Sequence, residues 1–174
     1  MAINSSIISL EKRRVVLIDA AILAVVYSIP TLSHALSVPL YLFEPMRMAL
    51  FVSILFLPDR KNAYLLAITL PLFSYIVSGH PVVVKNAIIA IELLANVFIL
   101  YRLLEMNFNY FISCFVSIIA SKILYYSLKY FVIYQGLFAT KLIDTSIIVQ
   151  LLISCLLSLA FWSIYNKRDK RING

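Results

Sequence analysis

Apolar residues fall into six runs, separated by short polar or proline-containing stretches. The runs cover residues 15–34, 43–57, 63–78, 83–104, 108–133 and 143–165. A helix that crosses a bilayer needs about 20 mostly apolar residues, because the hydrocarbon layer is about 30 Å thick. The pattern therefore predicts an all-α integral membrane protein with a bundle of six transmembrane helices. The third run is short and contains Pro71, which predicts a kink there or helix ends that lie elsewhere.

The composition agrees with a membrane protein. Of the 174 residues, 63% are hydrophobic and 13% are charged, whereas about a quarter of the residues of a soluble domain are charged. We divide the chain into an N-terminal segment 1–14, a transmembrane domain 15–166 and a basic tail 167–174. Cys114 and Cys155 lie inside apolar runs, where a thiol behaves as a small hydrophobe, so we expect neither a disulfide nor a zinc site.

Basic residues gather at alternate ends of the runs. Ten of them fall on the side of the two termini: Lys12, Arg13, Arg14, Arg60, Lys61, Arg102, Lys167, Arg168, Lys170 and Arg171. The opposite loops clearly offer only Lys141. Cytoplasmic loops carry the excess of lysine and arginine in multi-pass proteins. We therefore expect a protein of the cell (inner) membrane with both termini in the cytoplasm.

Several ionisable and amide side chains fall inside or at the outer ends of the runs. A charge in hydrocarbon costs several kcal/mol unless it is paired or hydrated, so such residues are where function is expected. The candidate substrate-binding residues are Glu44, Arg47, His80, Lys85, Glu92, Asn96, Lys122, Tyr126 and Gln150. Lys129 and Asp144 support this set.

The spacing of these residues places them on shared helix faces. Lys85, Glu92 and Asn96 follow each other at intervals of seven and four, and Lys122 lies seven residues before Lys129. Glu44 with Arg47, and Gln150 with Ser154 and Ser158, form similar stripes. We expect the stripes to face a polar pocket that opens to the outside under the loops 35–42, 79–82 and 134–142.

A purely structural role is the alternative for each residue. Arg47 and Glu92 could pair and hold helices together, and Lys122 and Lys129 could extend to an interface. His80 is next to a proline in a loop, where a histidine is more often structural.

Other classes of function lack their motifs. The chain has no glycine-rich phosphate loop, no His-Glu-x-x-His motif and no recognisable serine-nucleophile elbow. Its two histidines lie in different loops and cannot form an ordinary metal centre. We therefore expect no enzymatic activity, no cofactor and no metal. The net charge of +7 arises at the ends of apolar runs, which indicates lipid headgroups as partners rather than nucleic acid.

The first run contains Ala20 and Ala24, four residues apart, a spacing that lets another helix approach closely. With its length, six spans and cytoplasmic termini, the chain resembles the S components of energy-coupling factor transporters, which are small six-helix proteins that bind a vitamin or similar micronutrient. Ala20 and Ala24 look like the Ala-x-x-x-Ala motif of that family. The stretch from Pro39 to Leu57, a loop with proline that leads into a helix with Arg47, is similar in layout.

The resemblance implies a mechanism. The pocket would capture substrate from outside, and Ala20 and Ala24 would dock the first helix on a membrane-embedded T component. Two cytoplasmic ATPase subunits would drive the complex, and the protein would reorient to release its cargo inside. The only tryptophan, Trp162, lies near the cytoplasmic end, so stacking on a flat ligand would use tyrosine or phenylalanine, which argues against thiamine.

Two other classes remain open. A scaffold protein of the MreD type has a similar size and helix number but needs no charged pocket. A small membrane enzyme for lipid-linked substrates would use Glu92 or Glu44 as base, but no catalytic constellation accompanies them. Charges of both signs line the expected pocket, which favours a ligand with polar or charged groups.

Overall fold

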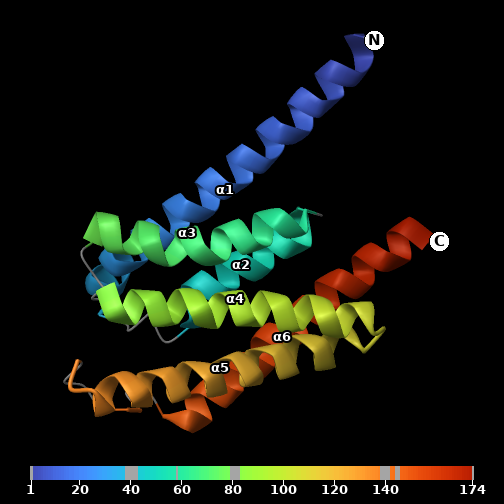
Figure 1. The fold of residues 1–174 in the computed structure, drawn as a ribbon. Helices are drawn as coiled ribbons and strands as arrows, with labels where there is room; N and C mark the ends of the chain where they lie inside the picture. The colour runs from blue at the N-terminus through green and yellow to red at the C-terminus, as the bar shows by residue number, and fades with distance from the viewer. Residues whose placement is uncertain are drawn as a thin grey trace. The chain divides into compact units, whose positions relative to one another are not determined.

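The computed structural model describes residues 2–37, 43–57, 59–78, 83–137, 142–143 and 146–173. In these ranges the regular elements are all helices (Figure 1), which confirms the all-α class. They are α1 (Ala2–Leu36), α2 (Pro45–Phe56), α3 (Arg60–Ser78), α4 (Val83–Glu105), α5 (Tyr110–Tyr134) and α6 (Ile147–Asn173). Helix α1 begins well before the first apolar run, and α6 continues through the basic stretch after residue 166.

Among the described residues, three helical segments are long and apolar enough to cross a membrane: Val83–Glu105, Tyr110–Tyr134 and Ile147–Lys167. This finding indicates a membrane protein. The apolar stretches Val15–Ile29 in α1 and Pro45–Phe56 in α2 are shorter. Helix α3 runs without interruption through Pro71.

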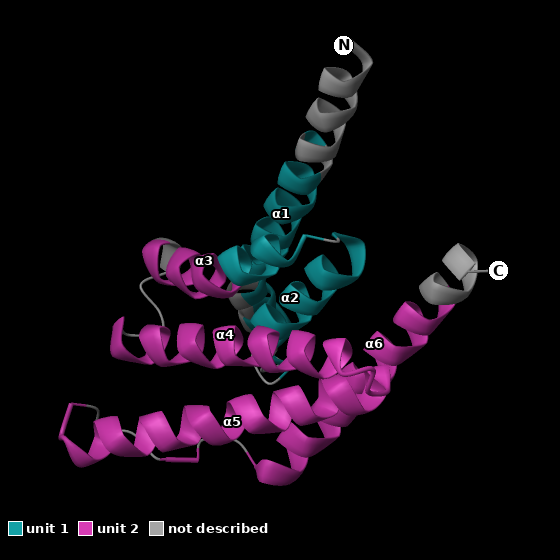
Figure 2. Cartoon of the chain, turned by 45° about the vertical axis from the view of Figure 1, so that its right-hand side comes forward, with its two compact units in different colours: residues 1–66 teal, residues 67–174 magenta. Residues whose placement is uncertain are grey.

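The chain divides into two compact units, Met1–Leu66 and Ala67–Gly174 (Figure 2). The first unit contains α1, α2 and the first residues of α3, and α1 packs against α2. In the second unit α5 packs against both α4 and α6. Helices α4 and α5 run antiparallel, side by side, in both views (Figures 1 and 2).

Local chemistry sets several helix ends. Pro45 starts α2, where its missing N–H would have had no helical partner. Asn107 adopts a left-handed backbone with φ 59° just after α4, a conformation that asparagine tolerates better than most residues. The Asn109 side chain then accepts a hydrogen bond of 2.8 Å from the Phe111 N–H and caps α5. The tight turn between α4 and α5 follows from these two asparagines.

A stripe of small residues lines the buried side of α5. Ser113, Ser117 and Ser121 recur every four residues, and each is fully buried. The Ser117 and Ser121 hydroxyls donate to the backbone carbonyls of Cys114 and Ile118, at 2.8 and 2.9 Å. These serines satisfy their own polar groups and add little bulk, so neighbouring helices can approach closely.

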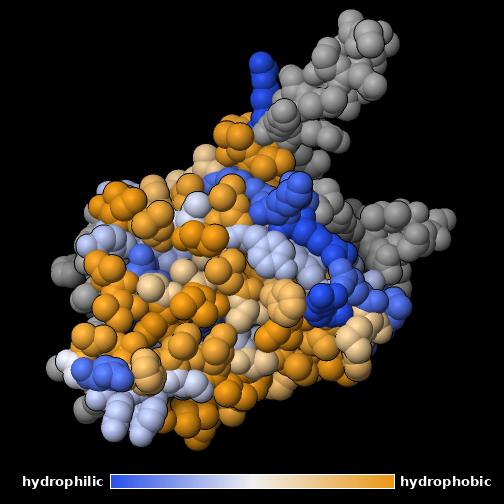
Figure 3. All heavy atoms as spheres, viewed as in Figure 1, coloured by the Kyte–Doolittle hydropathy of each residue, from blue (hydrophilic) through white to orange (hydrophobic). Residues whose placement is uncertain are grey.

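Large apolar side chains lie on the outer faces of the same helices. Phe98 on α4 is 51% exposed, and Ile123 on α5 and Leu156 on α6 are each 64% exposed. Hydrophobic side chains cover much of the face in Figure 3. An exposed apolar surface of this extent suits contact with lipid chains better than contact with water.

We expect Ser117→Leu to destabilise the second unit by about 1–3 kcal/mol, because a larger side chain cannot fit at a fully buried position without forcing the helices apart. Unfolding in mixed detergent micelles measures the change. The control is Val116→Leu at the neighbouring exposed position. Equal stability of the two variants would contradict the close packing of α5.

Candidate functional site

The second unit brings polar side chains from three apolar helices together. Lys122 on α5 donates through Nζ to Oε1 of Gln150 on α6, at 3.3 Å. Gln150 in turn donates through Nε2 to the Tyr126 hydroxyl, at 2.5 Å. These two bonds tie the C-terminal half of α5 to the start of α6. Three of the predicted site residues thus lie in direct contact.

Helix α4 contributes its own stripe. Asn96 is fully buried and donates through Nδ2 to the Ser117 hydroxyl of α5, at 3.2 Å. This bond turns the face of α4 that carries Lys85, Glu92 and Asn96 toward α5. Glu92 is 9% exposed, and Lys85 is half-buried. The predicted face of α4 is therefore an interior face of the second unit.

The Asn96–Ser117 bond also shows which residues of α4 and α5 lie at the same height along the two antiparallel helices. Lys129 lies twelve residues after Ser117, about 18 Å along α5. Because α4 runs antiparallel to α5, the residues of α4 at the same height lie twelve positions before Asn96, in the first turn of α4, which contains Lys85 and Asn86. Lys129 is 2% exposed and is one of the largest fully buried side chains. Glu92 lies four residues before Asn96, and Lys122 lies five residues after Ser117, so these two residues are at about the same height along the helices.

Two buried amide oxygens have no hydrogen-bond partner among the described residues. They are Oδ1 of Asn86 and Oδ1 of Asn96. A buried acceptor that is left unpaired costs about 1–3 kcal/mol. Both residues lie on α4, and Asn96 is the one that bonds to α5.

Glu44 and Arg47 belong to the first unit. They form an ion pair across one turn of α2, and Arg47 is 3% exposed. Glu44 has a left-handed backbone with φ 52°, which is uncommon for a residue other than glycine. This ion pair agrees with the expectation that Glu44 and Arg47 lie on the same face of a helix.

The first unit also holds a polar cluster that the sequence pattern did not reveal. Asn62 on α3 donates through Nδ2 to Asp19 Oδ1 on α1, at 3.1 Å, and to the Ser53 hydroxyl on α2, at 3.2 Å. One amide group therefore links three helices. The signal in the sequence was Asp19, a carboxylate inside the first apolar run.

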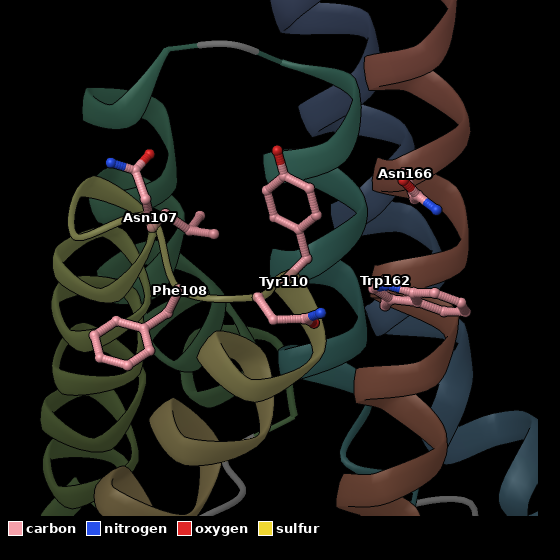
Figure 4. Close-up of a pocket in the computed structure, with 7 residues that line it drawn as sticks. Asn107, Phe108, Tyr110, Trp162 and Asn166 are labelled. Carbon is pink, nitrogen blue, oxygen red and sulfur yellow. The ribbon is translucent and has the colours of Figure 1, made fainter.

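The predicted docking residues Ala20 and Ala24 are both exposed on α1. Beside them, α1 and α2 enclose an apolar groove with a volume of about 620 Å³, lined by residues that include Ala21, Val25 and Met48. A second hollow of about 300 Å³ lies at the turn between α4 and α5, where Asn107, Tyr110, Trp162 and Asn166 contribute to the lining (Figure 4).

The predicted substrate-binding residues line neither hollow. Four of them, Arg47, Glu92, Asn96 and Gln150, are instead buried. His80, Lys141 and Asp144 lie outside the described residues, as do most of the loops that were expected to roof a pocket. The expected outward opening stays a prediction.

Within the described residues, no group of three histidine, cysteine, aspartate or glutamate side chains is placed to hold a metal ion. Cys114 is buried and Cys155 is partly buried, and both are free thiols.

Comparisons with protein-family models, with curated protein sequences and with solved structures gave no match.

Proposed function

We propose that the protein is the substrate-binding subunit of an importer of the energy-coupling factor type. It would capture a vitamin or related micronutrient from outside and deliver it through a membrane-embedded T component driven by cytoplasmic ATPase subunits. The observation that carries this proposal is the polar cluster between α4, α5 and α6, which includes the buried Glu92, Asn96, Lys129 and Gln150.

The cost of this cluster is the reason to assign it a function. A charged side chain in the middle of a bilayer costs several kcal/mol, and apolar residues of similar size would pack the same helices without that cost. Intramembrane ionisable residues generally mark substrate pathways or binding sites. A small polar molecule would give these groups a use that helix packing alone does not require.

The proposal includes six spans with both termini in the cytoplasm. The basic residues on one side of the apolar runs support it, since ten of them lie there. The exposed positions of Ala20 and Ala24 support α1 as the surface that meets the T component, because small residues allow close helix contact.

A structural scaffold of the MreD type is the second candidate. It is favoured by the hydrogen bonds among Lys122, Tyr126 and Gln150, which connect α5 to α6 without any ligand. In that case the polar residues would serve only to fix the helices in place.

Purification in mild detergent followed by mass spectrometry separates the two candidates. A substrate-binding subunit should retain a small molecule reproducibly, and adding that molecule should raise the thermal stability. A protein that is empty in repeated preparations, with no response to a panel of vitamins, would rule out the binding function.

Glu92→Lys should weaken ligand binding at least tenfold, about 1.4 kcal/mol, because it reverses a charge inside the cluster. Isothermal titration with the co-purified molecule measures the effect. The control is Glu105→Lys at the exposed end of α4. Glu92→Gln keeps the shape of the side chain and serves if the reversal prevents folding. Unchanged affinity in both Glu92 variants would make Glu92 structural.

Ala20→Trp and Ala24→Trp should abolish uptake of the ligand into cells and leave its binding affinity unchanged. The bulky ring would block the approach of a partner helix without touching the cluster in the second unit. Val25→Trp, at an exposed position on another face of α1, is the matched control. Normal uptake in both alanine variants would exclude this face as the docking surface.

Cysteine labelling tests the orientation. In a background with Cys114→Ala and Cys155→Ala, we expect a membrane-impermeant maleimide to label Leu137→Cys on intact cells. It should label Lys167→Cys only after the membrane is permeabilised. Both positions are exposed; Leu137 follows the end of α5, and Lys167 lies at the end of the apolar part of α6, so this part of α6 separates them. Labelling of both from the same side would disprove a span between them.

A further inference from the structure

The groove between α1 and α2 has an apolar lining along its whole length. Its volume is about 620 Å³, and every residue that lines it is an alanine, valine, isoleucine, methionine, phenylalanine or proline. On α1 the lining runs from Ile18 to Ile29, and on α2 it runs from Pro45 to Phe56. All of these residues belong to the first unit (Figure 2). An occupant of the groove therefore needs an apolar surface rather than hydrogen-bonding groups.

The length of the groove matches one leaflet of a bilayer. Eleven positions separate Ile18 from Ile29, and also Pro45 from Phe56, so each helix contributes about 16 Å of wall at 1.5 Å per residue. The hydrocarbon layer of a bilayer is about 30 Å thick, so one leaflet takes up about half of that distance. A partner helix that crosses the bilayer would extend well beyond the groove, whereas a single lipid acyl chain fits within its length.

Hydrogen bonds show which helix ends meet at one end of the groove. Asn62 in the first turn of α3 bonds to Asp19 on α1 and to Ser53 in the last turn of α2. Asp19 directly follows Ile18, and Phe56 is the last residue of α2. The groove therefore ends, at Ile18 and Phe56, where the first turn of α3 joins the other two helices.

Exposed cations flank this end of the groove. Lys61 directly precedes Asn62, and Arg13 lies five residues before Ile18, about 7.5 Å further along α1. Both residues are exposed. The same stretches of sequence also contain Lys12, Arg14 and Arg60, against Glu11, Asp19 and Asp59. Five basic residues thus stand against three acidic ones, which leaves a formal surplus of positive charge at this end.

We infer that the groove binds one acyl chain of an anionic phospholipid, whose phosphate lies at the end flanked by Arg13 and Lys61. Such a lipid combines an apolar chain that spans one leaflet with a negative headgroup at the membrane surface, and basic residues next to an apolar helix attract anionic lipids. Beside the opposite end, at Pro45, the charges of Glu44 and Arg47 compensate each other in an ion pair. Only one end of the groove therefore suits the headgroup.

This inference takes from the proposed function only the topology, in which α1 and α2 lie in the bilayer with the basic residues on the cytoplasmic side. It does not depend on an imported solute. Ala20 and Ala24, the proposed docking residues, are not among the residues that line the groove. The lipid site and the docking face are therefore separate surfaces of α1, and they can be tested separately.

The test is native mass spectrometry of the full-length protein released from detergent micelles, to which phosphatidylglycerol and phosphatidylcholine are added in equal amounts. We expect the first bound lipid to be phosphatidylglycerol. Its apparent affinity should be at least about fivefold higher than that of phosphatidylcholine, which corresponds to the roughly 1 kcal/mol that one basic residue near the membrane surface contributes.

Two substitutions fill the groove from different helices. Ala21→Trp on α1 and Val52→Trp on α2 place a bulky ring at exposed lining positions, so each should weaken the binding of phosphatidylglycerol at least tenfold. Val16→Trp is the matched control, because Val16 is exposed on α1 but does not line the groove. Arg13→Gln combined with Lys61→Gln should reduce the preference for phosphatidylglycerol to less than twofold.

Unchanged affinity in both groove variants, or equal affinity of the wild type for the two lipids, would overturn the inference. The two tryptophan substitutions lie on different helices, so one serves if the other prevents folding. A second copy of the chain is the other occupant that the same spectra detect. A wild-type dimer that both groove variants convert to a monomer, with lipid binding unchanged, would also overturn the lipid site.

The outcomes separate this inference from the proposed function. Lipid binding that depends on the groove, in a protein that never retains a small solute, would contradict only the proposed function. A retained solute in a protein whose lipid binding ignores the groove variants would contradict only the lipid site.

Discussion

The hydrocarbon of a bilayer offers no hydrogen bonds, so every polar group within it must find its partners inside the protein. In the second unit, the backbone is satisfied by long helices, and the serines on the buried side of α5 bond to carbonyls of their own helix. The remaining polar side chains meet across helices, as Asn96 meets Ser117 and Gln150 meets Tyr126. The arrangement of α4, α5 and α6 depends on these few contacts together with the close approach that small residues permit.

The buried lysines need stronger partners than these residues do. Serine and asparagine can be satisfied within a packed helix pair, but an ammonium group needs a charge or several acceptors. Lys122 obtains one amide oxygen from Gln150. In the first unit, the Arg47 charge has a carboxylate one turn away. The second unit holds the buried Glu92, Lys129 and Gln150 between apolar helices, which is why we propose that the ligand binds there.

The helices themselves were largely predictable, because apolar runs between proline, asparagine and basic residues define where each helix can begin and end. The exceptions are instructive: α1 starts at Ala2 and α6 continues to Asn173, since a helix can extend through a polar segment that carries no apolar signal. Intervals of four and seven correctly placed Asn96 and Gln150 in the interior. Asn86 and the bonds from Asn62 to Asp19 and Ser53 were missed, because a single polar residue in an apolar run does not reveal which helix it will face. Six spans, the orientation and the pocket stay predictions.

The ion pair between Glu44 and Arg47 has a consequence for assembly of the protein in the membrane. Both residues belong to the first turn of one helix, so their charges can compensate each other as soon as α2 forms. This helix can leave the insertion machinery as an almost neutral segment. Lys122 of α5, in contrast, receives the Gln150 oxygen only after α6 has been synthesised. The contact that joins α5 to α6 through Lys122 can therefore form only when both helices are present, whereas the pair in α2 forms within a single helix.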